Sequence, residues 1–153
     1  MKTLQLFPHR FKKIGWVIFI PSLIMGILTL SGVIKNIEIS VPVFFNNGLS
    51  FTGEDVGFFK TTTIDVFPNL FGVLIIIGGL LVGFSKEQTE DEYISSLRLR
   101  SVFWSLIVSY SIILLLFVTV FGYVFFTLMI LIMFLPLVLY VFRFNYLLFQ
   151  HEK

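Results

Sequence analysis

The sequence predicts an all-α integral membrane protein, a single membrane domain over residues 1–153 with four transmembrane helices. A small extracytoplasmic cap resembling a β-hairpin is expected between helices 1 and 2. Hydrophobic residues make up 57% of the chain and charged residues only 13%, and the mean hydropathy is +0.97. A soluble domain is closer to half apolar and a quarter charged. Long apolar runs flank a charged segment at residues 85–100, which must lie in water.

The first span is expected at residues 14–34. At about 1.5 Å per residue it is roughly 31 Å long, which matches a hydrocarbon core of about 30 Å. Within this run, Ser22 and Gly26 form a pair of small residues four positions apart. Such pairs let a neighbouring helix approach closely, so both residues are candidates for a helix-packing seam.

Residues 35–65 form the predicted extracytoplasmic loop. Alternating residues at 37–41 and 58–64, separated by turn signals such as Asn46-Asn47-Gly48, are typical of two paired strands. The loop aromatics could form a small core or insert partly into the membrane surface. The second span is expected at 66–84, and its glycines place three further candidates in the packing seam: Gly72, Gly79 and Gly83. The same glycines are compatible with homo-oligomers.

The remaining apolar run, residues 101–142, is about 63 Å long as one helix, twice the thickness of a membrane. It must therefore turn back, and Gly122 is the only strong helix breaker near its middle. We expect two further spans, at 101–121 and 123–143.

The distribution of Lys and Arg predicts the orientation. Nine of them lie in the two termini and the charged segment, and two lie in the loop between the first two spans. Because short cytoplasmic segments carry an excess of Lys and Arg, both termini and the 85–100 connection are expected in the cytoplasm. The expected location is the inner cell membrane, with the hairpin outside.

Two capping boxes mark the connection, Ser85 to Gln88 and Thr89 to Glu92. The second predicts that helix three begins near Glu90 and projects about two turns into the cytoplasm. A capped and solvated helix start is the favoured explanation of the cluster of charges, and contact with a partner protein or a lipid headgroup is the alternative. The candidate contacts are Glu90, Asp91, Glu92, Arg98 and Arg100.

No catalytic, cofactor-binding or metal-binding residue is predicted. The chain has no cysteine, and His9 and His151 are single and near the termini. The acidic run matches no calcium loop. The span serines have no intramembrane His or acid to activate them, so an enzyme is not expected. The basic residues form no continuous stripe, so a nucleic-acid partner is not expected.

The segment from Phe84 to Ser101, read as FSKEQTEDEYISSLRLRS, resembles a motif of uncharacterised small multi-pass membrane proteins of Bacteroidota. That motif runs S-K-E-K-x-E-D-E-x-I-x-x-L-R-x-x-S and precedes an apolar hairpin. Here Gln88 stands in place of the usual basic residue. The resemblance implies a bacterial membrane protein and a specific role for the segment, but no activity.

These patterns favour a non-enzymatic accessory, sensor or regulatory subunit. It would sit in the lipid bilayer and dock a cytosolic or membrane protein through residues 85–100. The alternative is an oligomeric channel or small-solute transporter, whose pore would be lined by hydroxyl side chains: Ser105, Ser109, Thr119 and Thr127.

Overall fold

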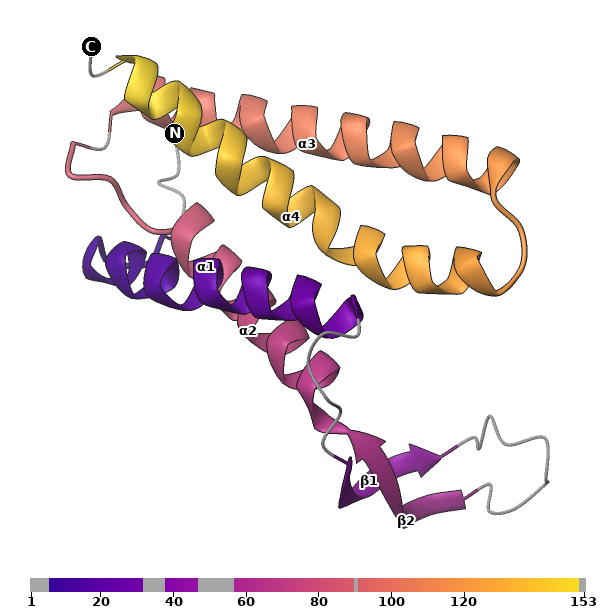
Figure 1. Cartoon of the computed structure of the whole chain (residues 1–153). Coiled ribbons are helices and arrows are strands. Elements are labelled where there is room, and N and C mark those ends of the chain that lie inside the picture. The colour runs from indigo at the N-terminus through magenta and orange to yellow at the C-terminus, as the bar shows by residue number, and fades with distance from the viewer. Residues whose placement is uncertain (1–5, 32–37, 47–56, 90, 152–153) are drawn as a thin grey trace. The chain divides into compact units, whose positions relative to one another are not determined.

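A computed structural model describes residues 6–31, 38–46, 57–89 and 91–151. Its elements, labelled in Figure 1, are α1 (Arg10–Leu30), β1 (Glu38–Asn46), β2 (Gly57–Asp65), α2 (Val66–Gly83), α3 (Glu92–Thr119) and α4 (Tyr123–His151). Within the described chain, four helices are long and apolar enough to cross a membrane. The prediction of a mainly helical chain with four span-length helices is therefore confirmed.

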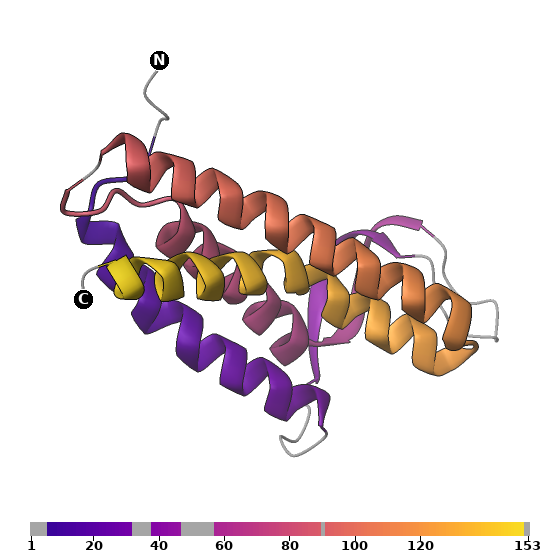
Figure 2. The ribbon, with the colours of Figure 1, turned by 90° about the horizontal axis from the view of Figure 1, so that it is seen from above.

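The chain forms two compact units, which are described separately. The first unit comprises residues 1–21 and 74–153, and the second comprises residues 22–73. In the first unit, α3 and α4 lie side by side as a helical hairpin, seen from two directions in Figures 1 and 2. The turn between them contains Gly122 at φ 85°, a conformation that glycine adopts without strain. The predicted turn is confirmed.

The helices do not end where the apolar runs end. α3 begins nine residues before the expected span at 101–121 and contains 28 residues, which makes it about 42 Å long. α4 continues through Arg143 to His151. α1 covers Arg10–Leu30 instead of 14–34. The start of α3 at Glu92 lies two residues after the start near Glu90 that the capping box predicts. A helix can extend beyond its membrane-embedded part, so the bounds of the spans stay predictions.

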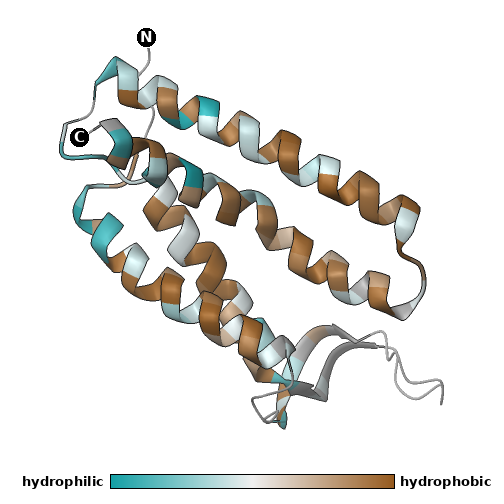
Figure 3. Cartoon of the chain, turned by 45° about the horizontal axis from the view of Figure 1, so that its top comes forward, coloured by the Kyte–Doolittle hydropathy of each residue, from teal (hydrophilic) through white to brown (hydrophobic). Residues whose placement is uncertain are grey.

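The inner and outer faces of α3 differ in character. Its buried residues lie on one face of the helix and end in three serines spaced four positions apart: Ile94, Leu97, Arg98, Ser101, Ser105 and Ser109. The outer face exposes large apolar side chains, including Phe103, Ile107 and Leu114. Figure 3 shows hydrophobic residues along most of α3 and α4 and hydrophilic ones near the start of α3 and the end of α4. An apolar exterior around a small-residue interior suits a helix in lipid.

The second unit contains the predicted strands. β1 and β2 pair antiparallel, from Glu38 opposite Asp65 to Asn46 opposite Gly57. The hydroxyls of Ser40 and Thr63 lie 3.4 Å apart across the pair. The expected turns within residues 47–56 lie outside the described residues. An extracytoplasmic position for this pair, and its role as a cap, stay predictions.

Candidate functional site

The segment before α1 is bonded to the connection that follows α2, and we call the region where they meet the polar end. Phe7 donates its N–H to the carbonyl of Phe84 over 3.0 Å and accepts the N–H of Lys86 over 2.8 Å. These two bonds make a parallel bridge between Phe7 and Ser85. The amino-terminal segment therefore fixes the start of the 85–100 connection.

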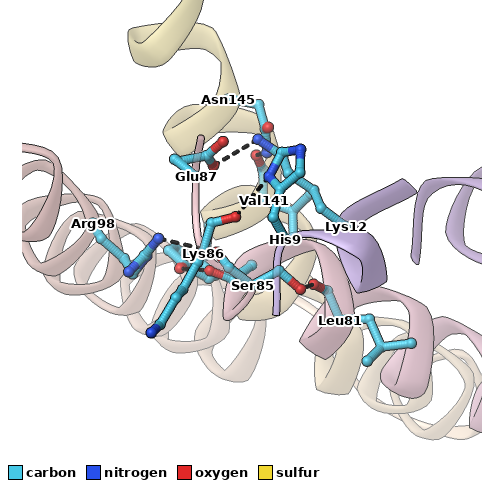
Figure 4. A network of polar contacts seen from close by, with 11 residues as sticks. His9, Lys12, Leu81, Ser85, Lys86, Glu87, Arg98, Val141 and Asn145 are labelled. Carbon is cyan, nitrogen blue, oxygen red and sulfur yellow. Dashed lines mark hydrogen bonds and ion pairs between the residues drawn. The ribbon is translucent and has the colours of Figure 1, made fainter. Parts of the chain in front are cut away.

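Side chains reinforce this bridge, as Figure 4 shows. Nδ1 of His9 donates to the carbonyl of Lys86 over 2.9 Å. Nζ of Lys12 lies 2.6 Å from Oε1 of Glu87, and the two side chains are only 15% and 11% exposed. Water screens a pair this sheltered less than a surface pair. Glu87 is thus held within the chain and is not a free charge of the connection.

Arg98 supports the connection from the side of α3. It is 3% exposed, and its Nη2 donates to the carbonyl of Ser85 over 3.1 Å. Its guanidinium carbon lies 5.0 Å from the ring centroid of Phe144 on α4. A carbonyl and an aromatic face both attract a cation, so these contacts offset part of the cost of burying the charge. We expected Arg98 to be accessible to a partner, and instead it is part of the interior.

α4 contributes Tyr140, which is 3% exposed and donates its hydroxyl to the carbonyl of Gly83 at the end of α2. Its ring centroid lies 5.4 Å from that of Phe84 and 6.0 Å from that of Phe144. A Cβ on Gly83 would collide with the Tyr140 ring. The absence of a side chain at Gly83 therefore leaves room for the Tyr140 ring, whose hydroxyl donates to the Gly83 carbonyl.

The start of α3 differs from the expected capping boxes. Asp91 is the N-cap, and its carboxylate accepts the N–H of Ile94 over 2.8 Å. The expected cap at Thr89 is wrong by two residues, because Asp91 supplies an equally good acceptor at the position the helix uses. Ser85 does not start a helix either. It is fully buried in the bridge, and its hydroxyl donates back to the carbonyl of Leu81.

The predicted contact residues are thereby separated into two groups. Asp91, Glu92 and Arg100 are exposed, whereas Arg98 is buried, and Glu90 lies outside the described residues. Tyr93, which the charge pattern did not single out, is 50% exposed beside Glu92. The predicted contacts that remain accessible are therefore Asp91 and Glu92 at the start of α3 and Arg100 two turns later, while Lys86, Gln88 and Thr89 of the connection are exposed as well.

A close approach of α1 to α2 in the first unit depends on two glycines that sequence reasoning missed, Gly15 and Gly78. A Cβ on Gly78 would lie 2.8 Å from the backbone nitrogen of Phe19, and one on Gly15 would lie 2.8 Å from that of Val82. Gly78 is adjacent to the expected Gly79, so the double glycine was the available signal. Gly15 precedes Trp16 at the edge of the apolar run, and no pattern in the sequence distinguishes it as a packing residue.

The other expected seam residues lie elsewhere. A Cβ on Gly79 would meet the Leu137 side chain of α4 at 2.6 Å. Three residues belong to the second unit, where Ser22 is buried and Gly26 and Gly72 are partly buried.

Within the described residues, no three His, Asp or Glu side chains are grouped so that they could hold a metal ion. Ser105 and Ser109 are 1% and 0% exposed and face the interior of the chain. Ser105 donates to the carbonyl of Val102 over 2.8 Å, and the exposed Thr119 donates to that of Leu115 over 2.8 Å. Two of the four residues expected to line a pore are therefore covered within a single chain.

Comparison with known proteins gives no further guidance, because no protein-family model, curated protein or solved structure matches this chain.

Proposed function

We propose that this protein is a non-enzymatic accessory, sensor or regulatory subunit of the bacterial inner membrane. Both termini would face the cytoplasm, and a partner protein would dock on the exposed start of α3. The observation that carries the proposal is an exposed acidic and aromatic helix start above a connection that is held by hydrogen bonds and an ion pair. We call this surface the docking face; it consists of Glu92, Tyr93 and Ser96, all exposed.

The bonded connection supports docking because it leaves little to order when a partner binds. The connection beneath the docking face is bonded to the amino-terminal segment through Phe7 and Lys12, and to α3 through Arg98. A preorganised surface loses less conformational entropy on binding than a flexible one. Exposed tyrosine is typical of residues that contribute strongly to binding.

Charge indicates the class of partner. Asp91 and Glu92 place two carboxylates at the helix start, where they are exposed. A basic segment of a cytosolic or membrane protein complements them, and complementary charges accelerate and orient association. The excess of Lys and Arg in the termini and the connection supports placing this surface in the cytoplasm.

Photocrosslinking in cells tests the proposal. A photoreactive phenylalanine analogue at Tyr93 should give a discrete protein adduct, and the same probe at exposed Phe44 on β1 should not. Glu92→Lys should abolish the adduct because it reverses the docking charge. Glu38→Lys, which reverses an exposed acid on β1, should leave it unchanged. Identical adducts from wild type and Glu92→Lys, or none from Tyr93, would contradict docking at this surface.

The channel alternative receives less support. A pore between several copies of the chain requires polar residues on the outer surface of each copy. Ser105 and Ser109, two of the four predicted pore-lining residues, are buried within the chain and do not meet this requirement. Measurement of solute flux in proteoliposomes tests this alternative directly, and flux from the purified chain alone would favour it over docking.

A further inference from the structure

Arg143 of α4 and Trp104 of α3 form a cation–π pair. The guanidinium carbon of Arg143 lies 4.2 Å from the ring centroid of Trp104. Trp104 remains 37% exposed, and Arg143 is partly exposed. Among the described residues, Nε of Arg143 has no hydrogen-bond partner and no carboxylate lies within ion-pair distance of the group. The guanidinium of Arg143 is thus held against Trp104 without an anionic partner among the described residues.

The depth of this pair along the helices points to the headgroup boundary. Measured at about 1.5 Å per residue from the helix ends that flank the turn, Trp104 lies about 22 Å from Thr119 and Arg143 about 30 Å from Tyr123. Helical side chains lean toward the start of their own helix, so Arg143 leans back toward the level of Trp104. With the turn at one face of a hydrocarbon core about 30 Å thick, the pair lies between about 22 and 30 Å from that face, just inside the opposite edge. Lipid phosphates lie just beyond that edge.

A second guanidinium is available on α3. Arg100 is exposed and lies one helical turn before Trp104 on the same side of the helix. Arginine binds phosphate oxygens through two parallel N–H donors, and tryptophan favours the membrane–water boundary. The three side chains therefore combine two phosphate donors with an aromatic surface suited to the glycerol region of a lipid.

We propose that Arg100, Trp104 and Arg143 bind the phosphate group of an anionic phospholipid in the leaflet nearest the start of α3. The docking proposal does not enter this argument, because the docking face uses Glu92, Tyr93 and Ser96. An anionic lipid is favoured over a zwitterionic one because the site contains two guanidiniums, and no carboxylate of the described residues lies within ion-pair distance of either.

Native mass spectrometry of the purified full chain in detergent tests the site with phosphatidylglycerol as the probe. Wild type should retain one tightly bound lipid, and Arg143→Gln should weaken its binding roughly tenfold, the effect of losing one charge-assisted hydrogen-bonding group. Arg143→Lys should restore it only partly, because lysine lacks the planar fork. Arg10→Gln, which removes an exposed charge at the start of α1, is the matched control and should bind as wild type does.

A second measurement does not depend on detergent. In a Trp16→Phe background, a brominated phosphatidylglycerol should quench the fluorescence of Trp104 more than brominated phosphatidylcholine at the same content, and Arg143→Gln should remove the difference. Equal quenching by both lipids in the parent protein would overturn the proposal. So would displacement of the lipid by millimolar inorganic phosphate, since that result indicates a site for the free ion.

Discussion

Replacing Gly78 by alanine is expected to force α1 and α2 apart at a point where their backbones approach closely. The added Cβ would lie 2.8 Å from the backbone nitrogen of Phe19 and 2.9 Å from its Cα, whereas ordinary contact begins at 3.4 Å. The two helices must therefore separate by about 0.6 Å at this point. Backbone atoms cannot rotate away as a side chain can, so the separation is shared by the neighbouring contacts.

The cost follows from packing. A gap of about 0.5–1 Å forfeits a quarter to a half of the dispersion energy of each facing atom pair, and overpacking typically costs about 1–3 kcal/mol. Alanine favours a helix over glycine by about 1 kcal/mol, but this gain largely cancels when the reference state is also helical. We therefore expect Gly78→Ala to lower the free energy of unfolding by about 2 kcal/mol.

Unfolding by sodium dodecyl sulfate in mixed micelles provides the assay, with the fluorescence of Trp16 on α1 as the probe. Gly79→Ala should cost less, because its Cβ meets the flexible end of the Leu137 side chain. Val73→Ile adds one carbon at an exposed position and should have no effect. If Gly78→Ala unfolds at the same detergent fraction as Val73→Ile, Gly78 does not set the distance between the helices.

Three further predictions concern the polar end and the orientation. Tyr140→Phe should cost about 1 kcal/mol of unfolding free energy, for one lost hydrogen bond, and Tyr140→Ala about 3–5 kcal/mol in the same assay. Lys12→Glu should lower the free energy of unfolding by about 1.5–3 kcal/mol. The double variant Lys12→Glu/Glu87→Lys should recover most of that loss, because the ion pair forms again with its charges exchanged. A double variant that recovers no stability would assign the loss to packing. Cysteines at the exposed Ser40 and Ser96 should react with impermeant reagents from opposite sides of intact cells; reaction from one side would contradict the orientation.

Composition and one glycine sufficed to predict the helical framework. The apolar runs predicted four helices. Gly122 predicted the turn within the apolar run at residues 101–142, because no other residue near its middle adopts a positive φ so easily. Alternation at residues 37–41 and 58–64 located strands β1 and β2. These features are local, so a single stretch of sequence contains their cause.

The contacts that assemble the polar end could not be predicted in the same way. Phe7 pairs with Ser85, and Lys12 with Glu87, across most of the first half of the chain. Neither pairing has a local signal, because each depends on where α1 and α2 place their ends. The burial of Arg98 likewise depends on Phe144 of a different helix. Charge patterning therefore predicted that Arg98 is accessible, and the packing of α3 against α4 buries it.

The two proposed surfaces share one rigid element. Glu92 of the docking face and Arg100 of the lipid site both lie on α3, about 12 Å apart along its axis. A phosphate held at Arg100 and Arg143 would fix the depth of α3 in the membrane, and hence the height of the docking face above the headgroups. Loss of the lipid should then weaken docking even though no docking residue changes. Arg143→Gln provides that comparison, because it lies outside the docking face.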